Sequence, residues 1–250
     1  MVRQLFLEIC VDSVASAIAA QEGGADRVEL CANLNEDGTT PSAGMIEVTR
    51  KNLSIGLQVM IRPRGGNFCY SVVEFEIMKK DIAVAKELGA NGVVCGMLNP
   101  DGTIDAERTR ELIELARPLQ VTFHRAFDVA AAPRRALETL IALRVDRLLT
   151  SGQARTAMEG LGLLAQLAQQ AAGRISIMPA SGINAENVRR ILAASGVNEI
   201  HAGSSVSGTK TDSPAEWFAA ARGVVDAQKV LALKMSMTSA PVGFGITPHG

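Results

Sequence analysis

Short apolar runs alternate with amphipathic segments along the whole chain. Four of the runs follow a helix-like stretch and a tight polar turn, at 25–30, 90–94, 145–149 and 197–200. Four others stand between them, at 5–9, 57–61, 119–123 and 175–178. Buried strands that alternate with helices at this spacing predict an α/β fold with a parallel sheet. Eight such units predict a TIM-type (β/α)8 barrel, a single domain with a closed parallel eight-stranded barrel.

The amphipathic segments are expected to form the outer helices and to leave the end of the chain without a regular element. We place the barrel in residues 1–235 and expect 236–250, which has no periodicity, to be a loosely ordered tail. The expected helices are 13–21, 42–51, 73–88, 105–117, 133–143, 157–172, 184–195 and 226–234, with a further helix at 215–222.

Composition narrows the class of protein. A length of 250 residues matches one barrel domain, and a net charge of −1 gives no basic surface for nucleic acid. No apolar run is long enough to span a membrane, so we expect neither nucleic acid nor membrane as a partner. The chain enters a strand at once, without room for a signal peptide, and its four cysteines are too sparse for a disulfide framework. We therefore expect a cytoplasmic protein with reduced cysteines.

A repeated Glu-x-Cys triplet ends the first two strands. Glu8 and Cys10 close the first strand, and Glu29 and Cys31 close the second. If the register is level, both glutamates point into the barrel mouth and both cysteines lie above them. Either the cysteines are small buried hydrophobic residues, or they form a two-thiolate site for a soft ion. The absence of a nearby His-x-His or Cys-x-x-Cys favours low-coordinate Cu(I) over tetrahedral zinc.

Polar residues also end several other apolar strands. Arg62 and His124 occupy equivalent places in two matching runs, and we expect the two glutamates to be their partners. Asp128 is placed to orient His124 as a general acid or base. The alternative is a structural layer of ion pairs that plugs the mouth. The predicted site at the mouth comprises Glu8, Glu29, Arg62, His124, Asp128 and His201.

Small residues follow the last three strands and suggest an anion site. Ser151 and Gly152 follow the sixth strand, and Ser181 and Gly182 follow the seventh. Backbone N–H groups there could approach an anion, and a helix beginning near Asn184 would add its positive end. The alternative is that small residues simply fit tight turns.

The remaining long loops and cysteines carry less information. Two polar, glycine-rich loops, 32–41 and 63–72, are long for this fold and are expected at its functional face. Cys95 is one residue out of phase with Cys31, so it is expected to pack outward against a helix. Cys69 lies in the second long loop, where nothing fixes its position.

Six motifs along the chain are long or unusual in kind: EICVDS (8–13), GADRVELC (24–31), TTPS (39–42), MIRPRGG (60–66), TFHRAFD (122–128) and LTSG (149–152). In these motifs the chain resembles the CutC copper-homeostasis family, over about residues 5–201. The resemblance implies a cytoplasmic β/α barrel linked to copper tolerance and trafficking, with Cu(I) bound by Cys10 and Cys31. The chain departs from the family at Asn67, at Ala180-Ser181-Gly182 and at Ala202. These departures weaken the prediction of an anion-binding loop after the seventh strand and of a third soft ligand near His201.

Three functions remain open at this point. The first is a Cu(I)-binding protein of copper homeostasis, in which the two glutamates would raise the thiol pKa values unless Arg62 or the ion offsets them. The second is an enzyme on a small anionic, possibly phosphorylated, metabolite: Arg62 fixes the anion, His124 with Asp128 moves a proton, and Glu8 or Glu29 completes the pair. The third is a scaffold whose rim binds a protein. We also expect a homo-oligomer, a dimer formed through the outer helices.

Overall fold

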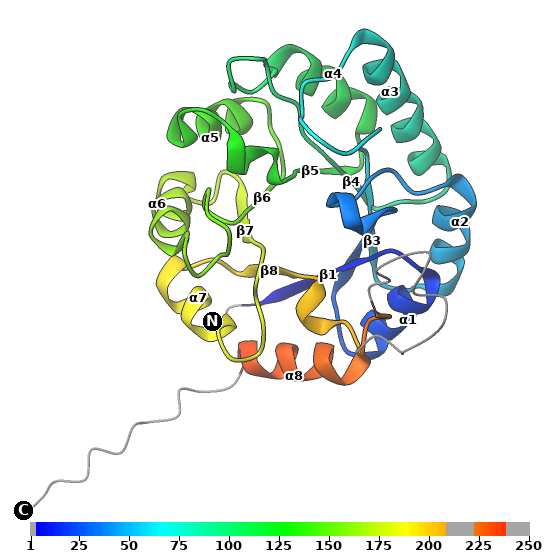
Figure 1. Cartoon of the computed structure of the whole chain (residues 1–250), viewed down its shortest axis with the longest axis vertical. Helices are drawn as coiled ribbons and strands as arrows, with labels where there is room; N and C mark the ends of the chain where they lie inside the picture. The colour runs from blue at the N-terminus through cyan, green and yellow to red at the C-terminus, as the bar shows by residue number, and fades with distance from the viewer. Residues whose placement is uncertain (1–3, 209–222, 239–250) are drawn as a thin grey trace, which may run out of the picture.

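Eight parallel strands form a barrel in the computed structural model, which describes residues 4–208 and 223–238 (Figure 1). They form one sheet in the order β7-β6-β5-β4-β3-β2-β1-β8, and β7 lies beside β8 so that the ring closes. This confirms the predicted barrel. The strands are β1 (Phe6–Val11), β2 (Arg27–Leu30), β3 (Gly56–Met60), β4 (Gly92–Cys95), β5 (Gln120–Phe123), β6 (Arg147–Thr150), β7 (Ser176–Pro179) and β8 (Glu199–Ala202).

A ring of helices surrounds the strands (Figure 1). Serine side chains cap α1, α2 and α3 by accepting a backbone N–H of the first turn, and Asp105 does the same for α4. No helix in the described part of the chain is long and apolar enough to cross a membrane. The helices are α1 (Val14–Glu22), α2 (Ala43–Asn52), α3 (Val72–Glu87), α4 (Ala106–Ala116), α5 (Pro133–Ala142), α6 (Leu161–Ala171), α7 (Val188–Ser195) and α8 (Ala227–Thr238), with short 3-10 turns η1 (Leu34–Glu36), η2 (Arg125–Val129) and η3 (Ser204–Val206).

Alternation along each strand divides the core into two regions. In β1, Leu7, Ile9 and Val11 pack into the main apolar core between the barrel and its helices. Cys10 lies instead with a small apolar cluster that includes Cys31 and contains no other residue of β1. The side chains that alternate with the apolar ones therefore fill the inside of the barrel.

Some element boundaries differ from the prediction. The helix expected at 184–195 begins only at Val188, after a turn in which the side chain of Asn184 accepts the N–H groups of Glu186 and Asn187. The helix start expected near Asn184 is therefore wrong. α8 extends to Thr238, while the further helix expected at 215–222 and the rest of the tail, 239–250, lie outside the described residues.

A layer of buried charges crosses the barrel below its mouth. Arg27, Arg147 and Glu199 are the first residues of their strands, and all three are buried. Arg27 Nε lies 2.5 Å from Glu8 Oε2, Arg147 Nε lies 2.5 Å from Glu199 Oε2, and Arg27 also pairs with Glu199. An ion-pair layer therefore exists, as one alternative held, but it lies beneath the mouth and does not include Arg62.

Candidate functional site

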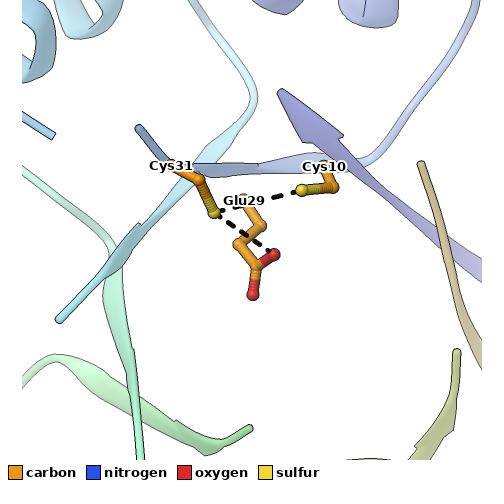
Figure 2. A group of neighbouring side chains, drawn as sticks. All are labelled: Cys10, Glu29 and Cys31. Atoms are coloured by element: carbon orange, nitrogen blue, oxygen red, sulfur yellow. Dashed lines mark hydrogen bonds between the residues drawn. The ribbon is translucent and has the colours of Figure 1, made fainter. Parts of the chain in front are cut away.

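The two thiols at the ends of β1 and β2 lie close together (Figure 2). The register of β1 and β2 places Glu8 opposite Arg27 and Cys10 opposite Glu29. A level register would have placed the two glutamates opposite each other and the two cysteines opposite each other, so that expectation is wrong. Closing a barrel requires neighbouring strands to be staggered, which explains the offset. The Sγ atoms of Cys10 and Cys31 are nevertheless 3.9 Å apart, and Cys31 Sγ is 3.7 Å from Glu29 Oε2.

His201 connects the two glutamates beside the thiols. Its Nδ1 atom is 2.8 Å from Glu8 Oε1, and its Nε2 atom is 3.8 Å from Glu29 Oε2. Although burial opposes the charged form, the carboxylate of Glu29 and hydrogen bonds to Cys10 and Glu8 raise the pKa of His201 well above its usual value. The imidazolium therefore supplies a positive charge at the thiol pair.

The two thiols differ in acidity. The hydrogen bond from Cys31 outweighs burial and, with the contact to His201, lowers the pKa of Cys10 to about 5. The same bond raises the pKa of Cys31, and burial and the charge of Glu29 add to the effect. The expectation that the glutamates raise both thiol pKa values unless Arg62 or the ion offsets them is therefore wrong for Cys10, because the hydrogen bond from Cys31 and, after it, His201 lower the pKa of this thiol.

Glu8 and Glu29 differ in acidity. Burial would raise the pKa of Glu8, but Arg27 and His201 hold it well below its usual value. Burial raises the pKa of Glu29 well above its usual value, and only the charge of His201 opposes it. Glu29 Oε1 also has no hydrogen-bond partner among the described residues. The pKa of the Glu29 carboxyl therefore lies above that of the Glu8 carboxyl.

Arg62 does not pair with the glutamates as expected. Its guanidinium donates to three backbone carbonyls, those of Glu36 at 2.6 Å, Gly38 at 2.7 Å and Gly66 at 3.0 Å. These carbonyls belong to the two long loops after β2 and β3. Arg62 therefore holds both loops at the mouth, where Leu34 and Phe68 of these loops line the cavity.

His124 is a neutral, buried imidazole. Its Nδ1 atom accepts the N–H of Ala126 at 3.2 Å, and its ring centroid lies 5.1 Å from that of Phe68. Burial, with a contribution from the charge of Arg62, lowers the pKa of His124 to about 3. Asp128 makes no hydrogen bond to it, so the predicted orienting role of Asp128 is wrong.

Gly96, directly after β4, leaves the space that the ring of His124 occupies. A Cβ atom there would lie 2.5 Å from Nδ1 and 2.6 Å from Cε1 of His124. We expect Gly96→Ala to displace the ring and to lower the free energy of unfolding by about 1–3 kcal/mol, as overpacking does. Urea unfolding of this variant measures the cost, with Gly44→Ala as control because that site is open. An equal effect of both variants would contradict the packing argument.

Asp128 instead fills the loop after β6. Its carboxylate accepts the backbone N–H of Ser151 at 3.0 Å, the hydroxyl of Ser151 at 2.9 Å and the N–H of Gln153 at 3.2 Å. The N–H of Gly152 donates to Thr150 Oγ1 at 2.9 Å. No backbone N–H of Ser151 or Gly152 is left for an external anion, so the prediction of an anion site at these two residues is corrected.

In the loop after β7, unlike the loop after β6, backbone N–H groups remain without an acceptor among the described residues. Ser181 and Gly182 have φ values of +78° and +69°, and both line the cavity together with Gly203. Within the described residues the backbone N–H groups of Ser181 and Gly182 have no acceptor, although Ser181 Oγ donates to the carbonyl of Arg155 at 2.7 Å. Anion binding at this loop stays a prediction, without help from α7, which begins farther along the chain.

The other two cysteines lie outside the site. Cys95 is buried in the core between barrel and helices, as predicted, and burial raises its pKa to about 12. Cys69 is half-buried and does not line the cavity. The sequence analysis did not identify three buried charged residues of the barrel, although a repeated signal marks them. Each is the first residue of its strand and follows an Asp or Asn in the repeated turn: Arg27 in β2, Arg147 in β6 and Glu199 in β8.

A cavity of about 380 Å³ opens above these groups. Cys10, Glu29, Arg62, His124 and His201 all line it, so the structure brings most of the predicted site together. Asp128, in η2 after β5, also lines it, whereas Glu8 lies below, in the ion-pair layer.

Known proteins with related sequences share the CutC name. The model of the CutC family matches residues 5–206. The family protein CutC of Chromobacterium violaceum is 55% identical over 196 residues, 78% of this chain and 79% of the relative. The human protein named copper homeostasis protein cutC homolog is 53% identical over 195 residues, 78% of this chain and 71% of the relative.

Solved structures agree with the fold. The crystal structure of a CutC protein from Streptococcus agalactiae has a TM-score of 0.76 and 35% identity, over 80% of this chain and 98% of that chain. A phosphoribosyl anthranilate isomerase from Thermotoga maritima has a TM-score of 0.63 over 94% of this chain and 98% of its own, but at 15% identity it shows only the shared barrel. Taken with the family model, the sequence relatives show that this chain belongs to the CutC family.

Proposed function

We propose that this chain is a cytoplasmic copper-homeostasis protein that binds Cu(I) through the thiolates of Cys10 and Cys31. The distance of 3.9 Å between their Sγ atoms is the observation that carries the proposal. A metal–thiolate bond is about 2.3 Å long, so two sulfurs on opposite sides of one ion lie about 4.6 Å apart. A small rotation of the half-buried Cys10 side chain supplies the difference.

The chemistry of the donors favours a soft monovalent ion. Thiolates select Cu(I), and the described residues offer only Glu29 as a third ligand within reach of both sulfurs. Two thiolates and Cu(I) carry one net negative charge, which the imidazolium of His201 offsets at the site. A second group, Glu8, Glu29 and His201, also has ligand types close together, but Glu8 and His201 already bind each other.

Removing one sulfur tests the proposal. We expect the reduced wild-type chain to take up one Cu(I) per chain, and Cys31→Ser to weaken binding by about 100-fold or more, since even loss of an outer partner of a metal ligand costs 10–100-fold. Anaerobic competition against a coloured Cu(I) chelator measures the affinity. Cys69→Ser is the matched control, because this cysteine lies outside the cavity. Undiminished uptake by Cys31→Ser would refute the proposal.

A further inference from the structure

The cavity at the mouth is far larger than a metal ion requires. Its volume of about 380 Å³ falls in the range of about 300–1,000 Å³ typical of sites for small organic molecules. Apolar side chains form much of its wall, among them Met60, Phe68, Leu149 and Ile183. The cavity therefore offers an apolar surface for the body of a ligand as well as polar groups for its orientation.

His124 lines this cavity and carries a buried hydrogen-bond donor that has no partner among the described residues. A neutral imidazole has one N–H, and Nδ1 of His124 already accepts the N–H of Ala126, so the hydrogen resides on Nε2. Nε2 has no partner among the described residues, and the side chain is 3% exposed. A buried donor without a partner destabilises the folded chain, and a ligand oxygen that accepts its hydrogen would remove this cost.

Arg62 adds a positive charge that no carboxylate neutralises. Its three acceptors are uncharged carbonyls, and among the described residues its Nε atom has no partner and none of the salt bridges involves it. The Arg62 Cζ atom lies 5.2 Å from the centre of the Phe68 ring, which also packs on His124. The cation, the free donor and one aromatic wall therefore meet at one side of the cavity.

We propose that this cavity binds a small organic anion whose charged oxygen accepts the Nε2–H of His124 and faces the guanidinium of Arg62. The body of the anion lies against Phe68 and Met60. The charged group is a carboxylate or a phosphate, because both present the oxygens that these donors recognise. The proposal goes beyond copper binding and uses neither Cys10 nor Cys31 as a ligand. It also replaces the expected proton-transfer role of His124 with that of a neutral donor.

Three probes of similar size test the proposal. Pyruvate carries a carboxylate, glycerol 3-phosphate carries a phosphate, and glycerol carries neither. The chain has only three histidines, so imidazole ¹⁵N NMR resolves His124 while calorimetry gives the affinity. We expect saturable binding of at least one anion, a shift of the His124 Nε2–H resonance, and no binding of glycerol. Binding of pyruvate alone would identify a carboxylate ligand, and of glycerol 3-phosphate alone a phosphate. Saturation by neither anion, or equal binding of glycerol, would overturn the proposal.

Two isosteric variants separate the donor from the fold. The side-chain oxygen of His124→Asn can take the place of Nδ1 and accept the N–H of Ala126, but its amide does not reach the position of Nε2. The amide of His124→Gln does reach it. We expect the Asn variant to bind the anion about tenfold or more weakly and the Gln variant to retain most of the affinity. Equal affinities of the two variants would contradict the role of Nε2.

Copper uptake and anion binding can fail independently. Cys31 does not line the cavity, so Cys31→Ser is expected to lose Cu(I) while binding the anion as the wild type does. His124→Asn is expected to bind Cu(I) normally. If Cys31→Ser bound neither ligand, the two sites would be one, and the anion proposal would be overturned as a separate site.

Discussion

Replacing Arg27 with methionine is expected to lower the free energy of unfolding by about 3–5 kcal/mol, the usual cost of breaking a buried ion pair. Arg27 is 7% exposed and pairs with both Glu8 and Glu199. Its loss leaves the carboxylate of Glu8, which is fully buried, with His201 as its one remaining partner within the described part of the chain. Methionine fills a similar space, so the cost comes from the unpaired charge and not from a void. Urea unfolding at pH 7 measures it.

A surface ion pair serves as the matched control for this variant. Arg174 and Glu138 pair at 2.8 Å with side chains that are about half exposed, and Arg174→Met is expected to change stability within measurement error. A double-mutant cycle adds a second check, because Glu8→Gln should cost less in the Arg27→Met background than in the wild type. Additive effects of the two substitutions would show that Arg27 and Glu8 do not stabilise each other.

Acid is expected to destabilise the protein through His124 at a pH above the range in which carboxyl groups of ordinary pKa titrate. The pKa of His124 is about 3 in the folded chain, whereas an unfolded histidine has a pKa near 6.5. As the pH falls below about 6.5, His124 becomes protonated in the unfolded chain but stays neutral in the folded chain. Unfolding therefore becomes more favourable. Between pH 6.5 and 4.5 this single group is expected to cost about 2 kcal/mol. About one pH unit or more above 6.5 its effect vanishes.

The difference between wild type and His124→Gln isolates this contribution, because the other groups titrate in both proteins. Glu29, with its raised pKa, gains stability as the pH falls and opposes His124. His201, also raised, gives stability that is complete below its unfolded pKa and is lost only as the pH rises. We expect the stability of His124→Gln relative to wild type to improve by about 2 kcal/mol from pH 6.5 to 4.5. Parallel stability curves would show that the folded ring accepts a proton.

The barrel could be predicted from the sequence because its signals are local. A strand is marked by a short apolar run, and a helix by its periodicity and its capping residue, so both can be recognised without knowledge of the rest of the chain. The repeated Glu-x-Cys triplet likewise brought Cys10 and Cys31 together on neighbouring strands. Parity along a strand also placed Cys95 correctly on the helix side.

The partners of the charged residues depended on the tertiary structure. Barrel closure staggers the strands, and this stagger pairs Glu8 with Arg27 instead of setting it level with Glu29. Arg62 donates to carbonyls of two loops, and no periodic sequence pattern predicts the paths of these loops. Asp128 accepts the backbone N–H of Ser151, which belongs to a loop after a different strand. Sequence patterns thus determined which side chains face the barrel interior. The global closure of the sheet and the loop paths decided which of them touch, because those distances depend on all eight strands together.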